Sequence, residues 1–115
     1  MTFTFYSNFL NHHQLPFCQA MYDLLGDDFT FVQTESVYDE YQKLGYMTDF
    51  DHLPFFLDAT ASKENEEKAV LLGDISDVCL IGSASDHYIQ KRLDDNRLTL
   101  RYSERLLKKG FLYLF

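Results

Sequence analysis

Polar side chains that can bind a ligand or move a proton follow the first apolar run of the chain. Ser7 and Asn8 come directly after this run, and Asn11, His12 and His13 follow shortly after them. Imidazole exchanges protons near neutral pH, so His12 and His13 are candidate catalytic residues, while Ser7, Asn8 and Asn11 are candidate substrate-binding residues. Adjacent histidines at the start of a helix point in different directions, so we expect at most one to face a ligand. The alternative is that Asn11, His12 and His13 cap the helix and face water.

Two further groups of candidate substrate-binding residues follow later apolar runs. Gly82 and Ser83 come directly after residues 78–81. Because glycine has no Cβ, its backbone N–H can approach a ligand closely; the alternative is that the pair merely ends a strand. Ser103 and Glu104 follow the run at 98–102, and Ser103 is also expected to cap a helix.

The elements that would position these residues can be predicted from the hydrophobic pattern. Aromatic and β-branched runs indicate strands, and apolar residues at steps of three and four indicate helices. The expected strands lie near residues 3–6, 29–34, 78–81 and 98–102, and the expected helices near 15–25, 63–72, 89–93 and 104–109. Gly26 and Gly73 are expected to end the first two helices. Residues 35–62 give a weak pattern, in which 55–57 form either a short strand or a buried turn.

This alternation predicts an α/β fold: a single three-layer, Rossmann-like domain over residues 1–115, with a parallel sheet of at least four strands. We expect the strand at 29–34 on one side of the first strand and the strands at 78–81 and 98–102 on the other. The strand at 78–81 is wholly apolar, so it should be fully buried near the centre. Ligands of such domains bind beyond the carboxyl ends of the strands, where the three candidate groups would converge.

Composition excludes several classes of protein. The 115 residues are 46% hydrophobic and 17% aromatic, which indicates one ordered core rather than a disordered chain. No apolar run approaches the ~18 residues of a membrane span, and no basic region precedes an apolar stretch as in a signal peptide. Cys18 and Cys79 lie in apolar segments, so we expect reduced core cysteines of a cytoplasmic protein.

Several common site motifs are missing from the sequence. There is no G-x-G-x-x-G after the first strand, no P-loop and no G-x-S-x-G nucleophile elbow. Asp49, Asp51 and His52 lie close together in an expected loop, but they have no partner pair at a defined spacing. We therefore expect neither a metal nor a cofactor.

Charge is distributed unevenly along the chain, whose net charge is -8. Residues 1–90 hold three of the ten Lys and Arg and fifteen of the eighteen acids, whereas residues 91–115 hold seven cations and three acids. The acidic bulk argues against nucleic acid as a partner. The basic end neutralises the rest of the fold or, alternatively, makes a peripheral contact with an anionic membrane surface at the inner face. Its apolar run 111–115 also predicts a homo-oligomer.

The residues carry a resemblance to a known family. The opening strand with Ser7-Asn8-Phe9, the segment His12 to Pro16, the strand 78–81 leading into Gly82-Ser83, and Arg101 to Arg105 before a basic helix occur in this order. Together they resemble the N-terminal domain of retaining glycosyltransferases that have two Rossmann-like domains, the type named glycosyltransferase group 1. The resemblance covers most of the chain except residues 35–62.

The resemblance implies an enzyme that moves a sugar from a nucleotide-sugar donor to an acceptor hydroxyl, in glycan or cell-surface polysaccharide synthesis. In that family the N-terminal domain holds the sugar acceptor. Because imidazole exchanges protons near neutral pH, one histidine would then contact an acceptor hydroxyl or a donor phosphate. The C-terminal domain that binds the nucleotide sugar has no counterpart in these residues. We therefore expect a truncated domain that is inactive alone.

Two alternatives from other classes stay open. One is a stand-alone α/β binding or regulatory module of the flavodoxin or receiver kind, although Tyr6-Ser7-Asn8 lacks the acidic cluster of a phosphate-accepting receiver. The other is a non-catalytic interaction domain that pairs through residues 111–115. A natural reading frame long enough for two domains of about 100–200 residues each would favour the transferase.

Overall fold

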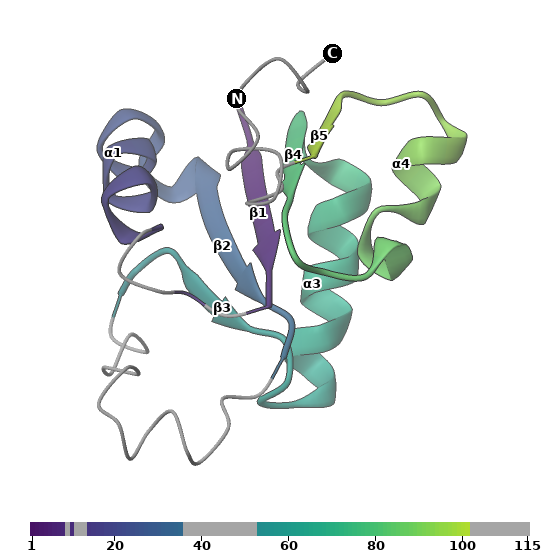
Figure 1. The fold of residues 1–115 in the computed structure, drawn as a ribbon, viewed down its shortest axis with the longest axis horizontal. Helices are drawn as coiled ribbons and strands as arrows, with labels where there is room; N and C mark the ends of the chain where they lie inside the picture. Colours follow the sequence, from purple (N-terminus) through teal and green to yellow (C-terminus); the bar gives the residue numbers. More distant parts are fainter. Residues whose placement is uncertain (9, 11–13, 36–52, 102–115) are drawn as a thin grey trace, which may run out of the picture.

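Five parallel strands form one sheet in the computed structural model, which describes residues 1–8, 10, 14–35 and 53–101 (Figure 1). The strands are β1 (Phe3–Ser7), β2 (Phe29–Gln33), β3 (Phe56–Asp58), β4 (Val78–Ile81) and β5 (Thr99–Arg101), in the spatial order β3-β2-β1-β4-β5. The α/β fold with a parallel sheet is confirmed. Residues 56–58 are a strand rather than a turn, and they extend the sheet beyond β2.

Helices cover both faces of the sheet (Figure 1). They are α1 (Leu15–Leu25), α3 (Lys63–Ile75) and α4 (Gln90–Asp94), with 3-10 turns η1 (Gly26–Asp28) and η2 (Asp86–Tyr88). Successive side chains of a strand point to opposite faces, so two cores result. The core beneath α1 contains Phe3, Phe5, Phe29, Phe31 and Cys18, and the core beneath α3 contains Tyr6, Val32, Ala69, Cys79 and Ile81.

Both cysteines are buried free thiols, one in each core. Burial raises the pKa of the Cys18 thiol to about 12, because the apolar surroundings disfavour the thiolate. The pKa of Cys79 is raised for the same principal reason. Both therefore stay protonated at neutral pH and act as small apolar core residues.

Local sequence signals explain where α1 and α3 begin and end. Pro16 lies in the first turn of α1, where its missing N–H costs nothing, and Gly26 ends the helix at a φ of 58°. Ser62 caps α3 by accepting a hydrogen bond from the backbone N–H of Asn65 at 3.1 Å. Glu64 and Glu66 lie in the first turn of α3, where the helix dipole favours them.

Three details differ from the sequence-based expectations. The helix α3 continues through Gly73 to Ile75, since Gly73 is a buried contact point with the backbone of Tyr88 rather than a stop. Ile89 and Leu93 lie one helical turn apart in the sequence, which indicates one apolar face, but only Ile89 is buried. Leu93 is 40% exposed, because α4 has only five residues and packs chiefly through its neighbour Ile89 and through Arg92. β1, not β4, is the central strand, and Leu80 of β4 is only half-buried.

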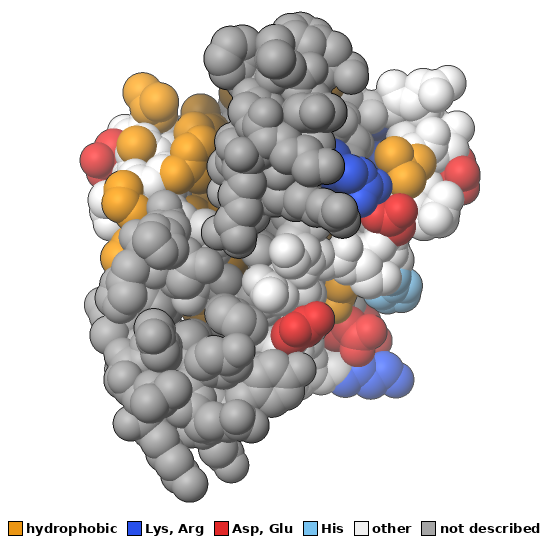
Figure 2. All heavy atoms as spheres, viewed as in Figure 1, with side chains coloured by type: hydrophobic (Ala, Val, Ile, Leu, Met, Phe, Trp, Pro, Cys, Tyr) orange, Lys and Arg blue, Asp and Glu red, His pale blue; other side chains and the backbone are white. Residues whose placement is uncertain are grey.

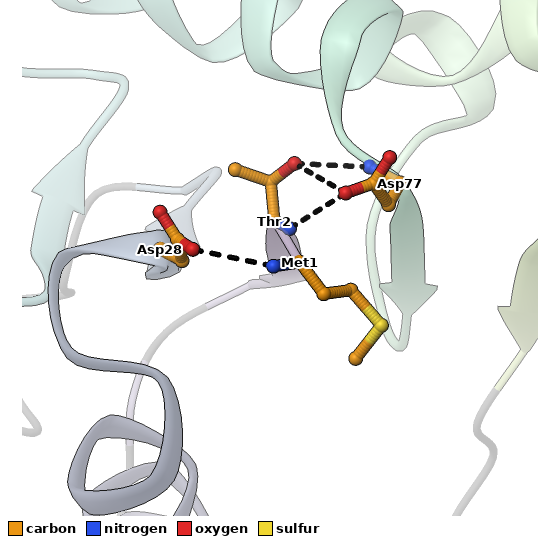
Figure 3. Close-up of polar contacts among 4 residues, drawn as sticks. All are labelled: Met1, Thr2, Asp28 and Asp77. Atoms are coloured by element: carbon orange, nitrogen blue, oxygen red, sulfur yellow. Dashed lines mark hydrogen bonds and ion pairs between the residues drawn. The ribbon is translucent and has the colours of Figure 1, made fainter.

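The amino ends of the strands are joined by polar contacts (Figure 3). Thr2 donates from its backbone N–H and its hydroxyl to Asp77 Oδ2, at 2.9 and 3.1 Å, and its hydroxyl accepts from the backbone N–H of Asp77. The terminal amine of Met1 lies 3.3 Å from Asp28 Oδ2. These contacts lie at the edge of the sheet opposite to the candidate site.

Candidate functional site

The chain reverses its direction of winding at β1. It leaves β1 through α1 to reach β2 on one side, and later returns through α3 to β4 on the other side. Ligands of open α/β sheets bind outside the carboxyl ends of the two strands at such a reversal. The register pairs Tyr6 with Ile81, so Ser7 and Gly82 lie side by side at this edge. The structure thus brings together two of the three predicted groups.

Gly82 lies close against the end of β1. Its backbone N–H donates to the carbonyl of Tyr6 at 2.8 Å, and a Cβ on Gly82 would lie 3.4 Å from Ser7 Oγ. That separation is an ordinary contact at the tight end of the range, and Gly82 itself is half-buried. The N–H of Gly82 is thus used within the sheet, and an added Cβ would face the buried side chains of Ser7 and Phe5.

Ser7 positions the loop. It is 1% exposed, its hydroxyl donates to Asn8 Oδ1 at 3.3 Å, and it accepts from Gln14 Nε2 at 3.3 Å. The carbonyl of Ser7 also accepts from the N–H and the hydroxyl of Thr34, at 2.9 and 3.1 Å. Ser7 therefore ties the exits of β1 and β2 to the start of α1, while half-buried Asn8 and exposed Ser83 present surface to a ligand.

The remaining predicted residues lie outside the part of the chain that the structure describes. These are Asn11, His12, His13, Ser103 and Glu104. The expected loop with Asp49, Asp51 and His52, for which we expect no metal, also lies outside the described residues.

Two tyrosines lie beneath the loop between β4 and η2. The hydroxyl of Tyr6 donates to the carbonyl of Ala69 at 2.6 Å, and its ring stacks on Tyr88 with centroids 5.3 Å apart. Burial raises the pKa of Tyr6 far above its ordinary value of 10.0, and burial also raises the pKa of Tyr88. Both phenols are therefore neutral at physiological pH: Tyr6 packs and donates a hydrogen bond, Tyr88 packs against it, and neither acts as a base.

A charged rim follows this loop, and sequence reasoning did not single it out. His87 Nε2 lies 3.9 Å from Glu66 Oε1, and Arg101 of β5 forms a 2.9 Å ion pair with Asp86. All four side chains are about half exposed or more. Ser85 accepts from the N–H of His87 at 3.2 Å, and this capping serine was the available sequence signal for the turn.

A cavity of about 250 Å³ lies at the carboxyl end of β3 and was also missed. It is lined by Phe56, Leu57, Asp58, Ala61 and Asn65. The weak pattern of residues 35–62 left open whether 55–57 form a short strand or a buried turn, so it gave no indication of a cavity beside β3. The cavity lies at the same end of the sheet as Ser7 and Gly82, because all the strands are parallel and their carboxyl ends meet there.

Within the described residues, no three His, Cys, Asp or Glu side chains are grouped as they would be around a metal ion. None of the helices in that part of the chain is long and apolar enough to cross a membrane. Comparison of the chain with protein-family models, with curated proteins and with solved structures gives no match. The functional interpretation therefore depends on the strand order and on the side chains at the carboxyl edge.

Proposed function

We propose that this chain is the acceptor-side domain of a retaining glycosyltransferase, which moves a sugar from a nucleotide sugar to an acceptor hydroxyl. The observation that carries the proposal is the reversal of winding between β1 and β4, with Ser7-Asn8 and Gly82-Ser83 side by side at their carboxyl ends. These are the positions at which the sequence resembles the family. The acceptor would lie over this edge.

The chemistry of the edge supports an acceptor rather than a donor diphosphate. Asn8 and Ser83 are uncharged hydrogen-bonding residues, and the segments Ser7-Asn8 and 82–85 contain no Lys or Arg. Diphosphates are usually held by cations or by rows of backbone N–H groups, whereas neutral hydroxyls suit amide and hydroxyl partners. A receiver-like phosphate acceptor would need carboxylates after β1, where Ser7 and Asn8 stand.

The histidine pair has a specific place in this proposal. His12 and His13 follow the first strand in the sequence, as Ser7 and Asn8 do. One of His12 and His13 would contact the acceptor hydroxyl or a donor phosphate and exchange a proton there. The nucleotide sugar would be held by a second domain that residues 1–115 do not supply, and transfer needs both substrates to be positioned together.

A panel of nucleotide sugars and acceptors tests the proposal. The full gene product that contains this chain should transfer sugar with at least one pair, whereas residues 1–115 alone should not, because the donor would be unbound. Turnover by the isolated chain would contradict the division of roles. Absence of turnover by the full product with every pair would contradict the transferase assignment.

Variants of the full product locate the site. Gly82→Ala adds a methyl group that would lie 3.4 Å from Ser7 Oγ and 3.6 Å from the ring of Phe5, so it would press on the segment Ser7-Asn8 over which the acceptor lies. We expect kcat/KM to fall by about ten- to a hundredfold, since small displacements of a bound substrate are costly. Gln19→Ala, an exposed substitution on α1, should leave the rate unchanged. His12→Ala and His13→Ala should differ, with only one reducing kcat.

A further inference from the structure

The cavity beside β3 shares a row of residues with the candidate site. Ser7 pairs with Gln33, and Gln33 pairs with Asp58, so one row runs across β1, β2 and β3 at their carboxyl ends. Neighbouring strands lie about 4.8 Å apart, which places β3 about 10 Å from β1. That separation corresponds to roughly two linked sugar rings. A ligand that begins over Ser7 and Gly82 can therefore extend to the cavity.

The walls of the cavity combine apolar surface with a few polar groups. Phe56, Leu57 and Ala61 are the apolar lining residues. The ring of Phe56 is held against Phe31 in a stacked arrangement, with centroids 6.2 Å apart and planes inclined by 12°. Small-ligand sites typically have such walls with a few polar groups that fix orientation. A pyranose ring has a matching shape, with an apolar C–H face and a rim of hydroxyls.

The polar groups of the cavity are mainly hydrogen-bond acceptors. Asp58 Oδ1 accepts from the backbone N–H and the hydroxyl of Thr60, at 2.9 and 2.6 Å, and Asn65 Nδ2 donates to the carbonyl of Asp58 at 3.1 Å. Among the described residues, no hydrogen bond uses Asp58 Oδ2 or Asn65 Oδ1. These two oxygens accept but cannot donate, so a ligand that binds to them must donate, as hydroxyl groups do.

The charge of the surroundings argues against an anionic ligand. None of the described residues that line the cavity is Lys or Arg. The nearby N-terminus of α3, which would otherwise attract an anion, is capped by Ser62 and already carries Glu64 and Glu66 in its first turn. A phosphate or carboxylate would be repelled by Asp58. The volume of about 250 Å³ lies below the ~300–1,000 Å³ of sites for drug-sized ligands, so it suits a single ring.

We propose that this cavity, which we term the β3 pocket (Phe56, Leu57, Asp58, Ala61 and Asn65), binds one neutral sugar ring of the acceptor, next to the ring that reacts. Asp58 and Asn65 accept hydrogen bonds from its hydroxyls, and Phe56 packs against its apolar face. The identity of the ring as part of the acceptor rests on the proposed function. Binding of a neutral sugar to the β3 pocket does not.

Amide NMR shifts of isotopically labelled residues 1–115 test the inference, because each amide reports its own surroundings. The probes are methyl glycosides, disaccharides and, as the anionic arm, inorganic pyrophosphate. We expect glycosides at millimolar concentration to shift the amides of residues 57–61 and Asn65, with disaccharides also shifting Ser7 and Gly82. Pyrophosphate should shift neither group. Shifts at the β3 pocket with pyrophosphate but not with glycosides would overturn the inference, as would no shift there with any glycoside.

Two variants with matched controls probe the contacts. Asp58→Asn keeps an acceptor for Thr60 but replaces one carboxylate oxygen by a donor, and it should weaken glycoside binding about tenfold. Asp95→Asn, on the far side of the sheet, should not change it. Ala61→Leu fills the cavity without touching a hydrogen bond and should abolish the shifts, whereas Ala20→Leu on α1 should preserve them. Unchanged affinity in Ala61→Leu would refute the site even if Asp58→Asn failed to fold.

The two proposals can fail separately. Disaccharide shifts at Ser7 and Gly82 without shifts at the β3 pocket would refute the pocket but leave the acceptor site. Glycoside shifts at the β3 pocket in a full gene product that transfers no sugar would support the pocket and refute the transferase.

Discussion

Arg92 is completely buried, with no carboxylate partner among the described residues. Its guanidinium instead donates to backbone carbonyls at the end of α3 and the start of β5, namely those of Gly73, Ser76, Asp77 and Leu98. The negative end of the α3 dipole faces this cation, which offsets part of the cost of burying it. One side chain thus joins α3, α4 and β5.

Replacement of Arg92 by methionine should destabilise the chain strongly. Arg92→Met leaves several buried carbonyls without donors, and each costs ~1–3 kcal/mol, so we expect a loss of at least about 3 kcal/mol in unfolding free energy. Arg101→Met removes an exposed ion pair with Asp86 and should cost under about 1 kcal/mol. Urea denaturation of both variants measures the difference. Equal losses would mean that the buried bonds contribute no more than a surface pair.

Asp77 makes the stability of the chain depend on pH. Its pKa is lowered below the ordinary value of 3.8, first by the backbone hydrogen bond from Thr2 and next by the hydroxyl of Thr2. A group with a depressed folded-state pKa stabilises the fold above its unfolded pKa and loses that effect as pH falls through the folded value. The contribution of Asp77 is therefore present at neutral pH and disappears in strong acid.

The matching experiment compares Asp77→Asn with wild type across pH. At neutral pH the variant should be less stable, and the gap should close as pH falls below about 3.8, which is the ordinary value. Thermal melting at a series of pH values gives the curve. A gap that stays constant into acid would show that the carboxylate charge is not the cause.

At the scale of elements, a glycine near a helix end can either end the helix or allow another element to pack closely against it, and Gly73 does the second. A Cβ on this residue would overlap the carbonyl of Tyr88, so Gly73 lets η2 approach α3 closely. Gly73→Ala should destabilise by about 1–3 kcal/mol through overpacking, although alanine gains about 1 kcal/mol in helix propensity over glycine. Gly26→Ala meets open space but has φ of 58°, so its cost should come from backbone strain alone.

Thermal melting, together with near-ultraviolet circular dichroism of the stacked Tyr6 and Tyr88, distinguishes overpacking at Gly73 from backbone strain at Gly26. Gly73→Ala should move η2 and perturb the near-ultraviolet signal of the stacked tyrosines, whereas Gly26→Ala should lower stability without that change. A stabilised Gly73→Ala would show that η2 shifts freely.

The secondary-structure elements whose bounds depend on neighbouring residues in the sequence were predicted well. The bounds of α1 and its end at Gly26 depend on neighbouring residues, so the chain itself specifies them. The strand β3 depends on pairing with β2, which is a tertiary contact. Arg92 similarly has the sequence context of an exposed helical residue. Of the candidate site, the pairing of Ser7 with Gly82 follows from strand order, but the β3 pocket needed coordinates.

At the scale of the whole molecule, exposed apolar surface remains. Phe17 and Leu24 of α1 are 42% and 78% exposed, and Figure 2 shows hydrophobic side chains gathered over α1. Leu98, just before β5, and Leu100 of β5 are also exposed, and β5 is the last described strand at that side of the sheet. The sequence adds the apolar run 111–115. Surface of this kind favours association in water.

We therefore expect residues 1–115 to self-associate. Each large apolar side chain removed from water contributes about 1.5–3 kcal/mol, so the five residues 111–115 can hold a dimer even after the loss of rotational and translational freedom. Sedimentation velocity should show a species larger than a monomer. Deletion of residues 110–115 should reduce it to a monomer, while Leu24→Lys should have a smaller effect because it removes one side chain. An intact chain that sediments as a monomer would contradict the prediction, and dissociation by Leu24→Lys but not by the deletion would assign the contact to α1.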